Sequence, residues 1–342
     1  MNQKPGQLVI SLDFELFWGV RDHRKLHEYR DPLLGVRQAI PAMLELFEEY
    51  GIRASWATVG FLFCNTKDEL LATLPRRLPA YHHLEMSPYA HIAHIGENEE
   101  EDPYHYAPSL IDAIAAAPGQ EIASHTYSHY YCMEEGQDAL DFEADLRAAV
   151  EIARHRGIML RSLVFPRNQV RRDYLGICHR LGISAYRGNP AIWPYEPHPY
   201  EKNTAMRRVS RMLDSIAPLT GNGCVANGTP MSRQPVNVPA TRYFRPLAGR
   251  HRMLCALQRR RLFGELDYAA RTGGIFHLWW HPHNFGLNLR AQLDELRTLL
   301  DRFHGWRRLE RMESVTMHEV VAGKGQDIWD SADSQVRRQR RG

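Results

Sequence analysis

Residues 7–14 read QLVISLDF, an apolar run that ends in acidic residues: Asp13 lies in it, and Glu15 follows Phe14. From there onward, strand-like segments alternate with amphipathic helical patterns. The predicted strands cover residues 7–14, 52–59, 121–124, 162–166, 183–187 and 274–280, and the predicted helices cover residues 31–50, 108–117, 138–156, 171–181 and 289–303. This alternation predicts an α/β architecture with a largely parallel sheet.

Two segments interrupt the alternation and are interpreted as insertions. Residues 66–107 are rich in His, Pro and acidic residues, and residues 190–265 are Pro-rich at first and then helical and Arg-rich. We expect one domain over residues 1–325. The polar, Arg-rich residues 326–342 are predicted to form a disordered tail.

The composition excludes several classes of protein. Of 342 residues, 44% are apolar and 24% are charged, which is the range of globular proteins and excludes global disorder. The mean hydropathy is −0.46 and no stretch reaches 18 apolar residues, so no membrane span is expected. A net charge of +3 gives no general argument for a nucleic-acid partner. The sequence does not set the oligomeric state.

The N-terminus and the cysteines both bear on the compartment. One Lys precedes a short apolar run that acidic residues break, and no small-residue cleavage site follows, so we expect no signal peptide. The five cysteines stand alone, without a C-x-x-C motif. A disulfide framework is therefore not expected, and the prediction is a reducing, cytoplasmic location.

Charged and imidazole side chains follow several predicted strands, at the point where each strand ends. They are Asp13 and Glu15, His125 and His129, Arg167, and His281 and His283. In parallel α/β folds these ends open on one face, which is where such folds place their active sites. We therefore expect four separate segments to place these groups around one opening at this face, the mouth of the site.

Two spacings within this set indicate a metal. His125 and His129 are four residues apart, so on a helical turn both imidazoles face one side and can share a metal ion, although chance pairs are common among 18 histidines. Asp13 and Glu15 are two apart and point the same way on an extended segment. Apolar neighbours crowd them, and buried carboxylates need partners, which a metal and an arginine would supply.

Four motifs carry a family resemblance: SLDFE (11–15), SHTYSH (124–129), FPRN (165–168) and HLWWHPH (277–283). In this order they resemble the motifs of the polysaccharide deacetylases, the NodB-like carbohydrate esterases, over roughly residues 6–325. The resemblance implies a distorted (β/α) barrel of about seven strands. It also implies a divalent metal, most often zinc, held by an acidic residue and two histidines.

The resemblance assigns roles to individual residues. His125 and His129 match the metal ligands, and Asp13 matches the catalytic base. The family commonly has a second, adjacent Asp where this chain has Phe14, so Glu15, as in a variant branch of the family, is placed on the metal.

The late motifs supply the remaining roles. Arg167 is expected to pair with the base and orient it, although the usual R-x-P order is inverted to P-R-N. His281 is expected to be the general acid. His283 is its rival, because both side chains point the same way along an extended exit.

Weaker candidates keep two interpretations each. Asp214 is expected either behind His281, as a partner acid, or on a helix surface. Tyr104, His105 and the acidic run 97–102 either cover the mouth or form a solvated loop. The tryptophans stack on a sugar ring or belong to the core: Trp18, Trp279 and Trp280.

The resemblance implies a metal-dependent amide hydrolase. The expected substrate is an N-acyl amino sugar, acetylated or formylated, that is an intracellular precursor of a surface polysaccharide. Two alternatives remain: a non-catalytic, metal-containing relative that binds glycan, with Phe14 marking a lost ligand, and a hydrolase of non-sugar cyclic amides. The presence of Asp13, Arg167 and His281 speaks against the binding module, which needs neither base nor acid.

Overall fold

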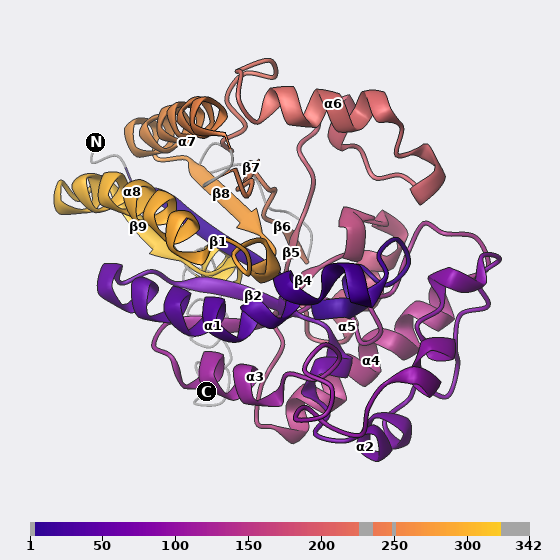
Figure 1. The fold of residues 1–342 in the computed structure, drawn as a ribbon. Helices are drawn as coiled ribbons and strands as arrows, with labels where there is room; N and C mark the ends of the chain where they lie inside the picture. The colour runs from indigo at the N-terminus through magenta and orange to yellow at the C-terminus, as the bar shows by residue number, and fades with distance from the viewer. Residues whose placement is uncertain (1–3, 226–234, 248–250, 323–342) are drawn as a thin grey trace, which may run out of the picture.

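A computed structural model describes residues 4–225, 235–247 and 251–322, and their strands form one curled parallel sheet (Figure 1). The strand order is β6-β5-β4-β3-β2-β1-β8-β7, and β9 also pairs with β1. All of these pairings are parallel. The strands are β1 (Gly6–Phe14), β2 (Ala54–Thr58), β3 (Gln120–Ser124), β4 (Ser162–Val164), β5 (Ala185–Arg187), β6 (Val236–Asn237), β7 (Arg242–Tyr243), β8 (Ile275–Trp280) and β9 (Met312–Val315).

Helices cover the outside of this sheet. Figure 1 shows α1, α7 and α8 running alongside the central strands, and α7 and α8 pack against each other. The helices are α1 (Leu26–Tyr50), α2 (Lys67–Ala72), α3 (Pro108–Ala116), α4 (Ala139–His155), α5 (Leu175–Arg180), α6 (Ala205–Asp214), α7 (Arg252–Thr272) and α8 (Leu289–Arg308). The α/β architecture and the distorted barrel that the sequence predicts are therefore confirmed.

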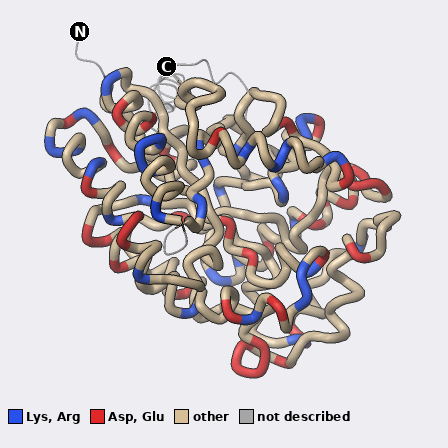
Figure 2. The backbone as a smooth tube through the Cα atoms, turned by 45° about the horizontal axis from the view of Figure 1, so that its top comes forward, with Lys and Arg blue, Asp and Glu red and all other residues tan. Residues whose placement is uncertain are grey.

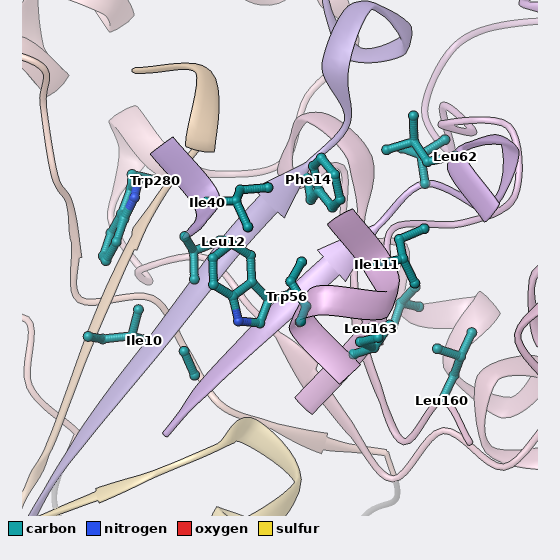
Figure 3. Close-up of a cluster of buried hydrophobic side chains, with 14 of the residues drawn as sticks. Ile10, Leu12, Phe14, Ile40, Trp56, Leu62, Ile111, Leu160, Leu163 and Trp280 are labelled. Atoms are coloured by element: carbon teal, nitrogen blue, oxygen red, sulfur yellow. The ribbon is translucent and has the colours of Figure 1, made fainter. Parts of the chain in front are cut away.

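The central strand β1 is buried on both faces. Ile10, Leu12 and Phe14 belong to the large core between sheet and helices, where Figure 3 shows them beside Trp56. Val9 belongs to a second cluster on the other face of the sheet, which combines residues in or beside the neighbouring strands with Met317 and Val320 from the segment after β9. Because side chains alternate along a strand, Asp13 continues the inward-facing series that begins at Val9.

The sheet has nine strands among the described residues rather than about seven. The added strands β6 and β7 have two residues each and lie in the second predicted insertion. Part of that insertion therefore belongs to the sheet. Segments of two residues are too short to show any periodicity, so the sequence pattern could not reveal them.

Charges of both signs are distributed along most of the chain (Figure 2). Within the described ranges, no helix is both long and apolar enough to cross a membrane. The tail predicted over residues 326–342 lies outside the described residues.

Candidate active site

The two histidines of the SHTYSH motif lie on an irregular loop after β3. The predicted helical turn is wrong: Thr126 and His129 have φ angles of 63° and 59°, in the left-handed region, and the loop contains no helix. Such a loop needs hydrogen bonds from outside itself, because it makes few regular ones of its own.

Asp145 of α4 supplies those bonds, and sequence analysis missed it. Its carboxylate accepts hydrogen bonds from the backbone N–H of Tyr127 at 2.7 Å and of Ser128 at 3.2 Å, and from the Ser128 hydroxyl. Burial raises the pKa of Asp145 to about 6, although these hydrogen bonds act in the opposite direction. An acidic residue on the apolar side of a helix, one turn from Phe142, was the available sequence signal.

Glu15, His125 and His129 come together as the sequence predicts. One carboxylate oxygen, Oε2 of Glu15, lies 3.2 Å from His129 Nε2 and 3.4 Å from His125 Nε2. All three side chains are buried, and their ligand atoms lie within 4.8 Å of one another. Ligands about 2 Å from a zinc ion at tetrahedral angles are about 3.3 Å apart, so this spacing fits a metal ion.

The orientation of His125 also fits a metal. Its Nδ1 lies 2.9 Å from the carbonyl oxygen of Val164 and donates to it, which directs Nε2 towards Glu15. That Nε2 atom is buried and has no hydrogen-bond partner in the described structure. A backbone carbonyl that holds the far nitrogen is the usual outer partner of a metal-ligating histidine.

The protonation states suit metal binding as well. Burial lowers the pKa of His129 to about 4, so its imidazole is neutral at pH 7. Burial raises the pKa of Glu15, but His281, His125 and His129 lower it more, and the net pKa lies well below the ordinary value. Neutral imidazole and ionised carboxylate are the forms that bind metal ions.

Asp13 is held by Arg187, not by Arg167. The Nη1 and Nη2 atoms of Arg187, at the end of β5, donate to Oδ1 and Oδ2 of Asp13 at 2.6 and 2.7 Å. Arg167 instead pairs with Asp22 and stacks between Tyr131 and Tyr200. The predicted pairing of Arg167 with Asp13 is therefore wrong.

The arginine that holds Asp13 is itself fixed on several sides. Arg187 also donates to Ser11 Oγ at 3.0 Å and to Asn168 Oδ1 at 2.9 Å, and its guanidinium lies 4.2 Å from the centre of the Trp279 ring. Burial raises the pKa of Asp13, but Arg187 and nearby histidines lower it more, so its net pKa falls below the ordinary value. Asp13 is thus an ionised carboxylate in a fixed orientation.

His281 and His283 occupy different environments, so geometry separates the rivals. His281 is partly exposed, and its Nε2 lies 3.5 Å from Glu15 Oε1 and 3.8 Å from Asp13 Oδ2. The His283 ring stacks on the His281 ring at 4.9 Å and is buried. Burial lowers the pKa of His283 to about 3, so its ring is neutral at pH 7 and is not the imidazolium that a general acid requires.

Most of these side chains line one cavity of about 770 Å³, although His125 and Arg187 do not. Its walls include Asp13, Glu15, His129, His281 and Trp279. A cavity of this size holds a drug-sized ligand, and therefore more than one sugar ring.

The weaker candidates have mixed outcomes. Trp279 lines the cavity, whereas Trp18 and Trp280 are core residues with no exposed surface. Both expectations for Asp214 are wrong, because it is buried at the end of α6 in an ion pair with Arg242.

The first insertion packs more tightly than a solvated loop. Tyr104 is buried beside Phe17, and the carboxylate of Asp102 bonds to Nδ1 of the buried His105. Neither Tyr104 nor His105 lines the cavity.

Comparison with known proteins places the fold. No family model and no curated protein matches the chain. Among solved structures, it is similar to a candidate polysaccharide deacetylase from Mycobacterium smegmatis, with a TM-score of 0.56 and 14% identity, over 96% of this chain and 93% of the other. It is also similar to PuuE allantoinase (TM-score 0.54, 13% identity, 94% and 90% covered) and to a 4-alpha-glucanotransferase from Thermococcus litoralis (0.52, 10%, 93% and 40%). The chain thus has the fold of a polysaccharide deacetylase, as the four motifs predict.

Proposed function

We propose that the protein is a metal-dependent hydrolase that removes an acetyl or formyl group from the nitrogen of an amino sugar. One observation carries this proposal. A Glu15, His125 and His129 cluster suited to zinc lies beside an ionised carboxylate and a partly exposed imidazole in a single cavity. A binding protein needs the first of these features, whereas amide hydrolysis needs all three.

Each group has a step in the reaction. A bound zinc ion would polarise the acyl carbonyl and lower the pKa of water. Asp13, kept ionised by Arg187, accepts a proton from the attacking water, and the oxygen of that water forms the new bond to the acyl carbon. His281 donates a proton to the amine nitrogen as the carbon–nitrogen bond breaks. The products are a free amino sugar and acetate or formate.

The substrate that we propose is an intracellular precursor of a surface polysaccharide. All five cysteines are free, and four of them are buried. Free, buried cysteines are typical of proteins from reducing compartments.

Hydrolysis of a cyclic amide is the second candidate. Its support is that a protein named as an allantoinase has the same fold at a similar TM-score. Because one fold hosts several reactions, this likeness alone assigns no substrate.

The test is hydrolysis by zinc-loaded protein of a panel of N-acetyl and N-formyl amino sugars and of cyclic amides. We expect acetate or formate release from the sugars, and a loss of about 10²- to 10⁴-fold in His281→Ala, the usual contribution of a general acid. His283→Ala is the matched control and is expected to retain more turnover. Hydrolysis confined to the cyclic amides would favour the second candidate, and no hydrolysis of either class would reject the enzyme.

A further inference from the structure

One wall of the cavity carries arginines that face it without a carboxylate partner. Arg208 and Arg211 lie on α6, and Arg245 follows β7; all three line the same cavity as Asp13 and Glu15. Within residues 4–225, 235–247 and 251–322, no carboxylate forms an ion pair with any of these three guanidinium groups. The four described acids that line the cavity pair with other groups: Asp13 with Arg187, Glu15 with histidines, Glu196 with Arg207 and Glu201 with His83.

Most other arginines that line the cavity are neutralised; the exception is the exposed Arg24, which has no ion pair among the described residues and lies over the Tyr29 ring. Arg167 and Arg242 both pair with carboxylates. Among the described residues, three of the four cavity arginines without a carboxylate partner therefore lie on the wall formed by α6 and the segment after β7.

The neighbouring residue on α6 provides an internal comparison. Arg207 does not line the cavity, and it lies 3.9 Å from Glu196 and 5.1 Å from the centre of the Trp193 ring. On this one helix, the arginine away from the cavity pairs with a carboxylate, whereas the two that face the cavity hydrogen-bond to uncharged oxygens.

Two of the cavity arginines are also partly buried and held in place. Arg211 donates to the carbonyl of Pro194 at 2.9 Å and to Asn203 Oδ1 at 2.6 Å, and Arg245 Nε donates to Ser215 Oγ at 2.8 Å. Burial lowers the pKa of both guanidinium groups, although arginine stays charged in proteins. Partly desolvated charges without a counter-ion are unfavourable, and a bound anion would offset this cost.

The position of Arg245 relates this wall to the hydrolytic groups. The Tyr243 ring lies 6.1 Å from the His281 ring and 5.4 Å from the Arg245 guanidinium carbon. Arg245 and His281, the proposed acid, therefore lie near the same Tyr243 ring. An anionic group attached to the reacting sugar can reach it.

We propose that Arg208, Arg211 and Arg245 form a phosphate subsite, so that the enzyme selects N-acyl amino sugars that carry a phosphate group. The proposal rests on the proposed function, because it places the phosphate on the substrate of that hydrolysis. The planar, five-donor guanidinium group matches the oxygens of a phosphate, and several such groups on one wall bind it in a fixed orientation.

The test compares binding of three probes to the zinc-loaded protein by calorimetry: N-acetylglucosamine 1-phosphate, N-acetylglucosamine and glycerol phosphate. We expect the sugar phosphate to bind at least about tenfold more tightly than the neutral sugar, since one hydrogen bond to a charged group contributes that much. The Arg211→Gln, Arg245→Gln double variant should lose this advantage, and Arg207→Gln should keep it. Arg208→Gln, on an exposed residue, should reduce the advantage without affecting the fold.

Two results would overturn the subsite: equal affinity for the neutral and phosphorylated sugars, or an advantage that persists in the double variant, which would place the phosphate on the metal. The probes also separate this proposal from the proposed function. Arginine-dependent binding of glycerol phosphate without hydrolysis of any N-acyl sugar would keep the subsite and reject the hydrolase. Equal kcat/KM for neutral and phosphorylated sugars would keep the hydrolase and reject the subsite.

Discussion

Replacing Arg187 by leucine isolates the ion pair on which the proposed base depends. Asp13 is buried and accepts both of its short hydrogen bonds, at 2.6 and 2.7 Å, from this one guanidinium. Arg187→Leu keeps an apolar side chain in the barrel but leaves the carboxylate desolvated and unpaired. The variant therefore tests whether the arginine keeps Asp13 ionised.

The expected magnitude follows from burial. Removing one partner of a buried ion pair costs about 3–5 kcal/mol, because the other charge remains without compensation. One pKa unit corresponds to about 1.4 kcal/mol, so the pKa of Asp13 should rise by roughly 2 to 3.5. In the wild type its pKa lies below the ordinary 3.8, so stability from the ionised group is present above pH 4 and lost as the pH falls further. In the variant the pH dependence of stability has the opposite sign. The free energy of unfolding is lowered most at neutral pH, and this loss shrinks as the pH falls.

Two measurements check this expectation. The acidic limb of the kcat/KM profile should move up by roughly 2 to 3.5 pH units, since only ionised Asp13 accepts a proton. A double-mutant cycle with Asp13→Asn, read from urea unfolding at pH 7, should give a coupling energy of about 2 kcal/mol or more. Arg167→Leu is the matched control, because Arg167 pairs with Asp22 and should leave the acidic limb in place. Additive unfolding energies, or a limb that moves only in the Arg167 variant, would refute the reasoning.

Three further predictions concern the metal centre. The His125→Ala, His129→Ala double variant should lose the one zinc ion per chain in elemental analysis, and a full complement would reject the ligands. Glu15→Gln should weaken zinc binding at least about tenfold in a chelator competition, whereas Asp13→Asn should keep the metal and lose about 10²- to 10⁴-fold in turnover; the opposite pattern exchanges the two roles. Asp145→Asn should weaken zinc binding, because one amide oxygen cannot accept all three hydrogen bonds of the loop. With the pKa of Asp145 raised to about 6, the wild-type free energy of unfolding should fall relative to this variant by about 2 kcal/mol from pH 4 to pH 7, and a constant difference would contradict the burial argument.

The sequence predicts the gathering of the site because parallel strands end at one edge of their sheet. Glu15, His125, His129 and His281 are far apart in the chain, yet each follows a strand whose apolar pattern is legible. The structure brings Glu15, His129 and His281 to one cavity, with His125 beside Glu15, in agreement with that principle. The conformation of the SHTYSH loop was not predictable in the same way, since its shape depends on Asp145 from a separate helix.

The partner of Asp13 could have been found by the same rule. The predicted strand 183–187 ends at Arg187, and a strand-end arginine is as strong a candidate as Arg167. The P-R-N motif favoured Arg167, but this residue has a φ angle of 54° in a tight turn and pairs with Asp22. A local motif does not reveal the direction of a side chain whose backbone is left-handed.

Phe14 shows why the acidic pair of this chain is spaced by one residue. Strand alternation sends the Phe14 side chain into the core between sheet and helices (Figure 3), whereas Asp13 faces the interior of the curled sheet. The chain turns sharply after β1, with a φ angle of 46° at Leu16, and Glu15 lies within this turn. The Glu15 carboxylate occupies the space that a side chain at position 19 would need, so this arrangement requires a glycine there. The carboxylate for the proposed metal therefore comes from a longer side chain, a turn and a glycine acting together, so Phe14 is compatible with the proposed metal site.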